Sequence, residues 1–266
     1  MRDIVIIPTY DRPEMLWMCL EYLSACKEAQ ELEIWIRIDN HDIVRSQTVE
    51  RETDAVLQNF SHLPLRIKYR QPHRYDGNTF NIMESYLEAY WSGAEHVYLI
   101  EDDVIVCKDF FSWHRQAQSD NQCFCSVAWK CLKDRVTNLP YVVSNSYASI
   151  GTCFKRESLA SIIEHAHHDY YSDLLLYCRK TFPGRGDGYT EQDGLIERIM
   201  VINQFKAVFP VTPHCFHVGW YGYHRGLPYP SGNLWQRYDQ VKKAVRDPQA
   251  VKALSNGLID VDAVMA

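Results

Sequence analysis

The chain has 266 residues, of which 46% are hydrophobic and 23% are charged, and its formal net charge is −6. This composition excludes global disorder, because it supplies enough apolar side chains for a sizeable core. The negative charge also argues against a generic nucleic-acid-binding protein, although a local basic patch remains compatible with it.

Strands and helices alternate over the first 130 residues. Apolar runs and apolar/polar alternation predict strands at residues 4–8, 32–38, 65–69 and 97–100. Apolar residues at helical spacing predict helices between them, from Pro13 to Lys27, from Ser46 to about Asn59, and from Asn78 to about Tyr90. This order predicts an α/β protein with a mostly parallel sheet and right-handed crossovers.

The pattern becomes less regular after about Ala128. It predicts strands at 148–154 and 206–209, and helices at 158–165, 173–178, 190–202 and from about Leu234. Two glycine-containing loops, 183–188 and 221–233, are typical either of lids over a site or of ordinary surface loops. In a lid, Trp220, Tyr221, Tyr223 and Tyr229 would supply stacking faces for a sugar or a base.

The most informative segment is an apolar strand that leads directly into Glu101, Asp102 and Asp103. Open α/β sheets place their ligand sites at the carboxyl ends of the strands. Clustered carboxylates are costly to bury, and a divalent cation with oxygen ligands is the simplest way to neutralise them. The alternative is a charged turn on the solvated surface.

Two more polar loops follow strands, at residues 8–12 and 39–42, and the three loops together predict a ligand crevice. The chain has no G-x-G-x-x-G after the first strand, which argues against a Rossmann dinucleotide site, and it has no P-loop motif. The ligand class that remains is a nucleotide diphosphate bound through a metal ion. The metal would act as a Lewis acid on the leaving group.

Three segments carry a resemblance to a known fold family. Residues 4–13, Ile-Val-Ile-Ile-Pro-Thr-Tyr-Asp-Arg-Pro, followed by a helix and by Ile-Arg-Ile-Asp-Asn at 36–40, resemble the opening of a GT-A glycosyltransferase. Residues 98–111 resemble its Asp-x-Asp motif, and are especially similar to the Glu-Asp-Asp segment of the N-acetylglucosaminyltransferases that start N-glycan branching. Residues 213–225 resemble the closing segment of family-2-like transferases.

The resemblance implies a single GT-A domain over residues 1–266, with a Rossmann-like, mostly parallel sheet flanked by helices. Residues 1–128 would form the nucleotide-sugar-binding half. Residues 129–266 would form the acceptor-side half, including the C-terminal helix. A phage or a bacterial origin is compatible with the resemblance.

The resemblance also implies roles for individual residues. Asp103 would be the direct metal ligand, usually to Mn²⁺, with Mg²⁺ as the alternative, and His217 would be a further metal or diphosphate contact. The other implied donor contacts are Glu101 and Asp102 to the ribose or to water, Arg12 and Asp39 to the nucleobase, and Arg225 to the diphosphate, which its planar fork suits. Two plainer interpretations stay open: Arg12 pairs with Glu14 or Asp11, and His217 is a satisfied core histidine.

An inverting transferase needs a general base to deprotonate the acceptor hydroxyl, and a carboxylate is the usual choice. Asp193 is the first candidate and Glu191 the second, because Thr-Glu-Gln-Asp at 190–193 resembles the Glu-Asp base segment of inverting GT-A enzymes. The spacing differs from the adjacent Glu-Asp of many members, so retention stays open. Thr190 with an acid three residues on is also typical of a helix-capping box.

Nine cysteines are scattered through the chain, which favours buried thiols in a reducing compartment. Cys123, Cys125 and Cys131 lack the paired C-x2-C spacing that is usual for zinc. The first apolar run is too short for a signal peptide, and no run approaches the ~20 residues of a membrane span. The sequence therefore predicts a cytoplasmic protein without a membrane anchor, located in the host cytoplasm if the gene is phage-borne.

These observations favour a metal-dependent glycosyltransferase that moves a sugar from a nucleotide-diphosphate sugar, with UDP-sugars first, to a hydroxyl acceptor. The acceptor could be a glycan, a small molecule or a hydroxymethylated DNA base, as in some phage enzymes that act on flipped bases. Basic residues suit the DNA acceptor if they are not simply solvated: Arg66, Lys68, Arg70, His73, Arg74, Arg237, Lys242, Lys243 and Arg246. Two different classes of protein also stay open, a sugar-phosphate nucleotidyltransferase and a non-catalytic sugar- or nucleotide-binding protein.

Overall fold

The computed structural model describes residues 2–39, 47–70, 75, 77–130, 140–184, 188–219, 221 and 229–246. Within them, one mixed sheet has the order β3-β2-β1-β4-β8-β6-β9-β7, and β5 pairs with β10 in a second, small sheet. The strands are β1 (Asp3–Thr9), β2 (Glu33–Ile38), β3 (Leu65–Tyr69), β4 (His96–Leu99), β5 (Val104–Val106), β6 (Cys125–Val127), β7 (Tyr141–Ser144), β8 (Thr152–Lys155), β9 (Ala207–Pro210) and β10 (Cys215–His217).

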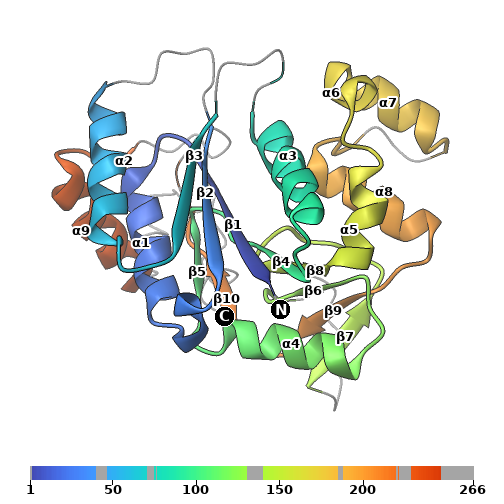
Figure 1. Ribbon diagram of the computed structural model, residues 1–266, viewed down its shortest axis with the longest axis horizontal. Coiled ribbons are helices and arrows are strands. Elements are labelled where there is room, and N and C mark those ends of the chain that lie inside the picture. The colour runs from blue at the N-terminus through green and yellow to red at the C-terminus, as the bar shows by residue number, and fades with distance from the viewer. Residues whose placement is uncertain are drawn as a thin grey trace.

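Helices cover both faces of the main sheet (Figure 1). They are α1 (Pro13–Ser24), α2 (Gln47–Asn59), α3 (Asn78–Trp91), α4 (Phe110–Asp120), α5 (Arg156–Ile163), α6 (His168–Ser172), α7 (Leu174–Thr181), α8 (Gln192–Ile202) and α9 (Leu234–Arg246), with a 3-10 turn at Lys27–Gln30. α1, α2 and α9 lie on one face of the N-terminal strands, and α3, α5 and α8 lie on the other.

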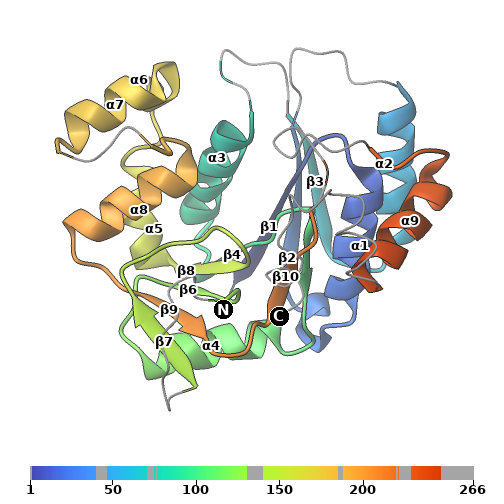
Figure 2. The ribbon, with the colours of Figure 1, turned by 180° about the vertical axis from the view of Figure 1, so that it is seen from behind.

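β1 lies in the middle of the fold, with one hydrophobic core on each face of the sheet. All seven of its residues are buried. Because side chains alternate along a strand, Val5 and Ile7 join the core under α1 and α9, while Ile4 and Ile6 join the core under α3, α5 and α8. Figure 2 shows the β5–β10 ribbon on the α1 side of the sheet, where β5 packs into the first of these cores.

The predicted α/β architecture with a mostly parallel sheet is confirmed. β1 pairs in parallel with both β2 and β4, and β2 pairs in parallel with β3. β8 then runs antiparallel to β4 and β6, β9 is parallel to β6, and β7 is antiparallel to β9. The reversal begins where the sequence pattern becomes irregular.

Several element boundaries differ from the prediction. The strand expected at 148–154 begins only at Thr152, and the helix after it begins at Arg156. Gly77 rather than Asn78 is the N-cap of α3, and the proposed cap at Ser46 lies outside the described residues. Short or polar elements were not predicted at all, namely β5, α4, β6, β7, α6 and β10.

Two expectations about the whole chain can be compared with the described residues. Their eight cysteines are free thiols, and six of the eight are buried, whereas Cys131 lies outside the described residues. No helix in the described part of the chain is both long enough and apolar enough to cross a membrane.

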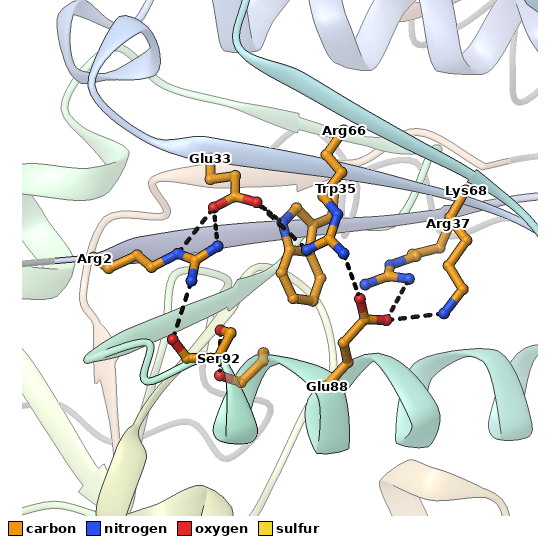
Figure 3. A network of polar contacts seen from close by, with 9 residues as sticks. Arg2, Glu33, Trp35, Arg37, Arg66, Lys68, Glu88 and Ser92 are labelled. Atoms are coloured by element: carbon orange, nitrogen blue, oxygen red, sulfur yellow. Dashed lines mark hydrogen bonds and ion pairs between the residues drawn. The ribbon is translucent and has the colours of Figure 1, made fainter.

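Glu33 of β2 and Glu88 of α3 organise a network of charges between α3 and the strands β2 and β3 (Figure 3). Glu88 of α3 accepts from Arg37 at 2.8 Å, from Arg66 at 2.9 Å and from Lys68 at 3.0 Å. Arg37 is the buried member, because only 4% of its side chain is exposed. Burial raises the pKa of Glu88, but Arg37 and Lys68 outweigh it, so that the pKa lies below its ordinary value.

We expect Glu88→Gln to lower the free energy of unfolding by about 1–3 kcal/mol, because it leaves the buried Arg37 guanidinium without its counter-charge. Glu33→Gln is a matched control: both glutamates are 28% exposed, but the arginines paired with Glu33 are Arg2 and Arg66, which are 45% and 49% exposed. Such exposed pairs contribute little, so the control should cost less than about 1 kcal/mol.

Urea denaturation measures both variants. Because the folded-state pKa of Glu88 is lowered, its contribution exists above the unfolded pKa and is lost as the pH falls through the folded pKa. The gap between wild type and Glu88→Gln should therefore close in acid. Equal losses for the two variants at neutral pH would contradict the role given to Arg37.

Candidate functional site

The three acids lie at the carboxyl end of β4, in the tight turn that leads into β5. The Val104 N–H donates to the Glu101 carbonyl at 2.9 Å and closes this turn. Asp102 is 3% exposed and Asp103 is 8% exposed, so these carboxylates are not a charged turn in open solvent. Buried carboxylates need partners, and the loop after β1 provides them.

Arg12 neutralises the two aspartates directly. Its Nη1 donates to Asp103 Oδ2 at 2.9 Å, and its Nη2 donates to Asp102 Oδ1. Thr9 at the end of β1 donates its hydroxyl to Asp102 Oδ2 at 2.8 Å. Hydrogen bonds with an ionised donor or acceptor are stronger than bonds between neutral groups. Here they join the carboxyl ends of β1 and β4. Arg12 therefore pairs with the acid cluster rather than with Glu14 or Asp11.

β10 brings the late histidine to the same cluster. It pairs antiparallel with β5, which sets His217 opposite Val104, and His217 Nε2 lies 3.5 Å from Asp103 Oδ2. The next residue, Val218, donates its N–H to the Asp103 carbonyl at 2.8 Å. At Gly219 a Cβ atom would collide with the Asp103 carboxylate. Sequence reasoning missed this glycine, whose small size allows the close approach.

The surroundings of the three acids give them different affinities for a proton. Burial, together with the negative charge of Asp103, raises the pKa of Glu101 to about 7. Burial also raises the pKa of Asp102, to about 6, against the opposing effect of Arg12. Burial acts on Asp103 too, but Arg12 and His217 outweigh it and hold its pKa well below the ordinary range. Asp103 is therefore the acid that stays fully ionised.

The donor set at this point fits a divalent cation that also binds phosphate. Asp103 offers a carboxylate oxygen and His217 an imidazole nitrogen, and both are ligand types found on Mn²⁺. No group of three or more His, Cys, Asp or Glu side chains within the described ranges is placed to hold an ion. Cations such as Mg²⁺ are commonly held by one or two carboxylates, substrate phosphates and water. The site fits that open arrangement and not a closed protein cage.

Asp39 lies at the end of β2, as predicted, and its main partner is Arg70. Arg70 Nη1 donates to Asp39 Oδ1 at 2.6 Å and to the Gly77 carbonyl at 3.3 Å. The guanidinium also lies 4.2 Å from the centre of the Phe80 ring. Asp39 and Arg12, both predicted to hold a nucleobase, are thus each engaged with a charged partner. Sequence reasoning placed Arg70 only in a basic cluster, although its position directly after β3 was a usable signal.

Two residues near the end of the described chain, Tyr221 and Arg237, hold the loop that carries Arg12. Tyr221 accepts from Arg12 Nη1 at its carbonyl, at 3.2 Å, and donates its hydroxyl to Glu14 at 2.6 Å. Arg237 of α9 donates to the other oxygen of Glu14 at 3.0 Å. Tyr221 is fully buried, so its ring is not available for stacking, whereas Tyr229 is 47% exposed. Trp220, Tyr223 and Arg225 lie outside the described residues.

The candidate bases lie in the first turn of α8 and just before it. Thr79 at the start of α3 donates to Gln192 at 2.9 Å, and Asn78 donates to Glu101 at 3.4 Å. The start of α3 therefore contacts both Glu101 and the start of α8, so that the turn carrying Asp193 is joined to the acid cluster through two residues of α3. Burial raises the pKa of Asp193 above its ordinary value, although the Gly194 N–H opposes this.

Glu191 differs from Asp193 in exposure and in partners. It is exposed, precedes α8 as its N-cap residue, and accepts the Thr190 N–H at 3.1 Å. The capping box at Thr190 is wrong, because α8 begins at Gln192 and its N-cap makes no side-chain capping bond within the described part of the chain. Asp193 is thus not used in a capping box.

No family model matches the chain, and no curated protein matches its sequence. Solved structures do match. The mannosyltransferase PcManGT from Pyrobaculum calidifontis, in complex with GDP-Man and Mn²⁺, is 15% identical with a TM-score of 0.52, over 99% of this chain and 72% of that one. TarS 1–349 from S. aureus, in complex with UDP-GlcNAc, is 12% identical with a TM-score of 0.54, over 97% of this chain and 72% of that one.

At such identities the similarity shows the fold alone. The predicted GT-A glycosyltransferase fold is confirmed by these two neighbours. The chain spans 60% of the length of a further structure of TarS 1–349, at a TM-score of 0.49. The activities and ligands of these neighbours are statements about those proteins alone.

Proposed function

We propose that this chain is a glycosyltransferase that moves a sugar from a nucleotide-diphosphate sugar, with UDP-sugars first, to a hydroxyl acceptor. The observation that carries the proposal is the buried Asp102–Asp103 pair at the carboxyl end of β4, held by Arg12 and faced by His217 at 3.5 Å from Asp103. The shared fold supports it, because PcManGT was solved with GDP-Man and Mn²⁺ and TarS with UDP-GlcNAc.

Each group of residues at these strand ends then has a task in binding the donor. Asp103 and His217 would hold Mn²⁺ or Mg²⁺, and a bound ion would supply Lewis-acid stabilisation of the diphosphate leaving group. Glu101 and Asp102 present carboxylate oxygens that accept from ribose hydroxyls or water. In the Asp39–Arg70 pair, a carboxylate that accepts hydrogen bonds lies beside a guanidinium that donates them. Such a pair suits the edge of a pyrimidine, which carries both N–H donors and carbonyl acceptors. Arg225 remains the predicted diphosphate clamp.

Asp193 would act at the acceptor end. A carboxylate with a raised pKa is a better proton acceptor than an ordinary aspartate. It would take the proton from the acceptor hydroxyl as that oxygen attacks the sugar, which corresponds to inversion by direct displacement. Glu191, which is exposed, is the second candidate.

The structure removes much of the support for DNA as the acceptor. Arg66 and Lys68 are paired with Glu88, Arg70 with Asp39, and Lys242 with Glu21, so these cations are compensated by acids. Arg237 pairs with Glu14 and Glu52. His73 and Arg74 lie outside the described residues. We therefore favour a glycan or a small hydroxylated molecule as the acceptor.

A thermal-shift experiment tests the donor and the metal together. The wild-type protein is heated with UDP-, GDP- and other nucleotide sugars, each with Mn²⁺ and with a chelator. A ligand at 100 times its Kd stabilises by about 2.7 kcal/mol, which raises the midpoint by about 5–10 °C for a domain of this size. We expect nucleotide sugars that carry one particular nucleobase to give this shift, and only when Mn²⁺ is present.

Each outcome decides something. A full shift with the chelator present would contradict the metal site at Asp103 and His217. No shift with any nucleotide sugar would overturn the proposed function. A shift with nucleoside triphosphates but not with nucleotide sugars would favour a nucleotidyltransferase.

A further inference from the structure

Tyr189 lies just before α8 in an unusual backbone conformation with its ring in solvent. Its side chain is 78% exposed. Its φ is +40°, in the left-handed region that disfavours residues with a Cβ atom. Glycine would adopt this backbone at lower cost. The strained backbone of Tyr189 must therefore be held by other contacts, and its exposed ring is accessible to a ligand.

Buried groups hold this backbone in place. Arg198 of α8 is 7% exposed, and it donates to the Gly188 carbonyl at 2.7 Å, to the Gly194 carbonyl at 3.0 Å and to the Tyr189 carbonyl. Gly194 lets the strained peptide approach the helix, since a Cβ there would collide with the Tyr189 carbonyl. A buried arginine and a glycine in the helix thus fix the backbone under an exposed ring.

The turn that carries the ring leads directly into the start of α8, where the carboxylates of the proposed acceptor end lie. Glu191 and Asp193 follow Tyr189 within four residues, and the start of α8 is joined to α3 through the Thr79–Gln192 bond. Asp193 is partly buried and Glu191 is exposed. An aromatic ring and two carboxylates on one short segment bring a flat apolar surface and several hydrogen-bond acceptors into one region.

We propose that Tyr189 is the acceptor-binding platform, and that its ligand is a neutral sugar ring whose C–H face stacks on the phenol ring while its hydroxyls donate to Glu191 and Asp193. This inference rests on the proposed function and deepens it by naming the acceptor as a carbohydrate. A sugar fits because it carries an apolar face and hydroxyl donors at once. An aliphatic lipid chain would use only the apolar surface.

Saturation-transfer NMR with four neutral disaccharides tests the platform: maltose, cellobiose, lactose and N,N′-diacetylchitobiose. We expect at least one to bind the wild type and Tyr189→Phe, which keeps the ring. Binding should weaken about tenfold or more in Tyr189→Gly, which removes the ring. Trp91→Ala is the matched control, because Trp91 is an aromatic residue 73% exposed on α3, and it should bind like the wild type.

Tyr189→Gly separates binding from folding. Glycine relieves the positive φ but adds freedom to the unfolded chain, and these effects offset each other, so the unfolding midpoint should stay near the wild-type value. Loss of disaccharide binding without loss of stability supports the platform. Unchanged disaccharide binding in Tyr189→Gly would overturn it.

The donor thermal shift keeps this proposal distinct from the proposed function. A nucleotide-sugar shift in the wild type with no disaccharide signal overturns the carbohydrate acceptor alone. Absence of the nucleotide-sugar shift overturns the proposed function, and the platform falls with it. Tyr189→Gly should show the full nucleotide-sugar shift, because Tyr189 takes no part in the contacts that hold Asp103.

Discussion

Asp103→Asn is expected to lower sugar transfer by about 10³-fold or more, since it removes the charge on which the proposed metal site depends and such a site supplies several kcal/mol. The side chain keeps its size, but it loses the carboxylate that Arg12 contacts at 2.9 Å and that His217 faces at 3.5 Å. The nucleotide-sugar thermal shift with Mn²⁺ should disappear together with the transfer activity. Product formation and the shift are measured on the same preparation.

Asp109→Asn is the matched control for this change. Asp109 lies six residues downstream in the same segment, its side chain is 59% exposed, and it faces His214 at 3.0 Å. Transfer by this variant should stay within a few-fold of the wild type. Asp103→Asn must also be shown to remain folded, because Arg12 then pairs with one buried acid instead of two. Undiminished transfer in a folded Asp103→Asn protein would contradict the site.

Asp193→Asn is expected to reduce transfer by about 10²–10⁴-fold, which is the usual contribution of a general base. Donor binding should persist, because this variant leaves the acid cluster intact. In the wild type, the rate should fall as the pH drops through the raised pKa of Asp193, since the base acts only when ionised. The variant should lose this acid limb along with its activity, and a pH–rate profile measures both effects.

The stability of Asp193→Asn distinguishes a lost base from a damaged fold. A carboxyl group whose folded pKa is raised destabilises the protein above its unfolded pKa. Asparagine removes that cost, so the variant should be at least as stable as the wild type at neutral pH. Glu191→Gln is the comparison variant: it removes an acceptor contact but keeps the proposed base, so it should lower transfer much less than Asp193→Asn. A larger loss of transfer in Glu191→Gln than in Asp193→Asn would assign the base to Glu191.

The N-terminal half could be predicted from the sequence because its pattern is long and regular. β1 to β4 are apolar enough to read as strands, and Pro13 lies at the start of α1 as expected. β5, β6 and β10 have three residues each, too few for a periodic signal. α4 was missed because polar side chains share its buried face, including His114 and Gln118, which both bond to the Ser126 hydroxyl.

The candidate site was predictable only as a set of strand ends. That logic located Asp103, Arg12 and Asp39 in one region, since parallel strands end at one edge of the sheet. It could not show that Arg12 pairs with Asp102 and Asp103, because that choice depends on three-dimensional proximity across 91 residues in the case of Asp103. Gly219 was missed for the same reason, whereas the position of Arg70 directly after β3 was a signal that the sequence did offer.

The contacts that close the Arg12 loop have a consequence for the order of folding. Tyr221 lies 209 residues from Arg12, and Arg237 lies 223 residues from Glu14. Closing such long loops has an entropic cost and makes folding slow. On the ribosome, a nascent chain can join Arg12 to Asp103 before His217 and Tyr221 have been synthesised. The aspartates would therefore already be paired with Arg12 while competence to bind a donor waits for His217 and for the Tyr221–Glu14 bond.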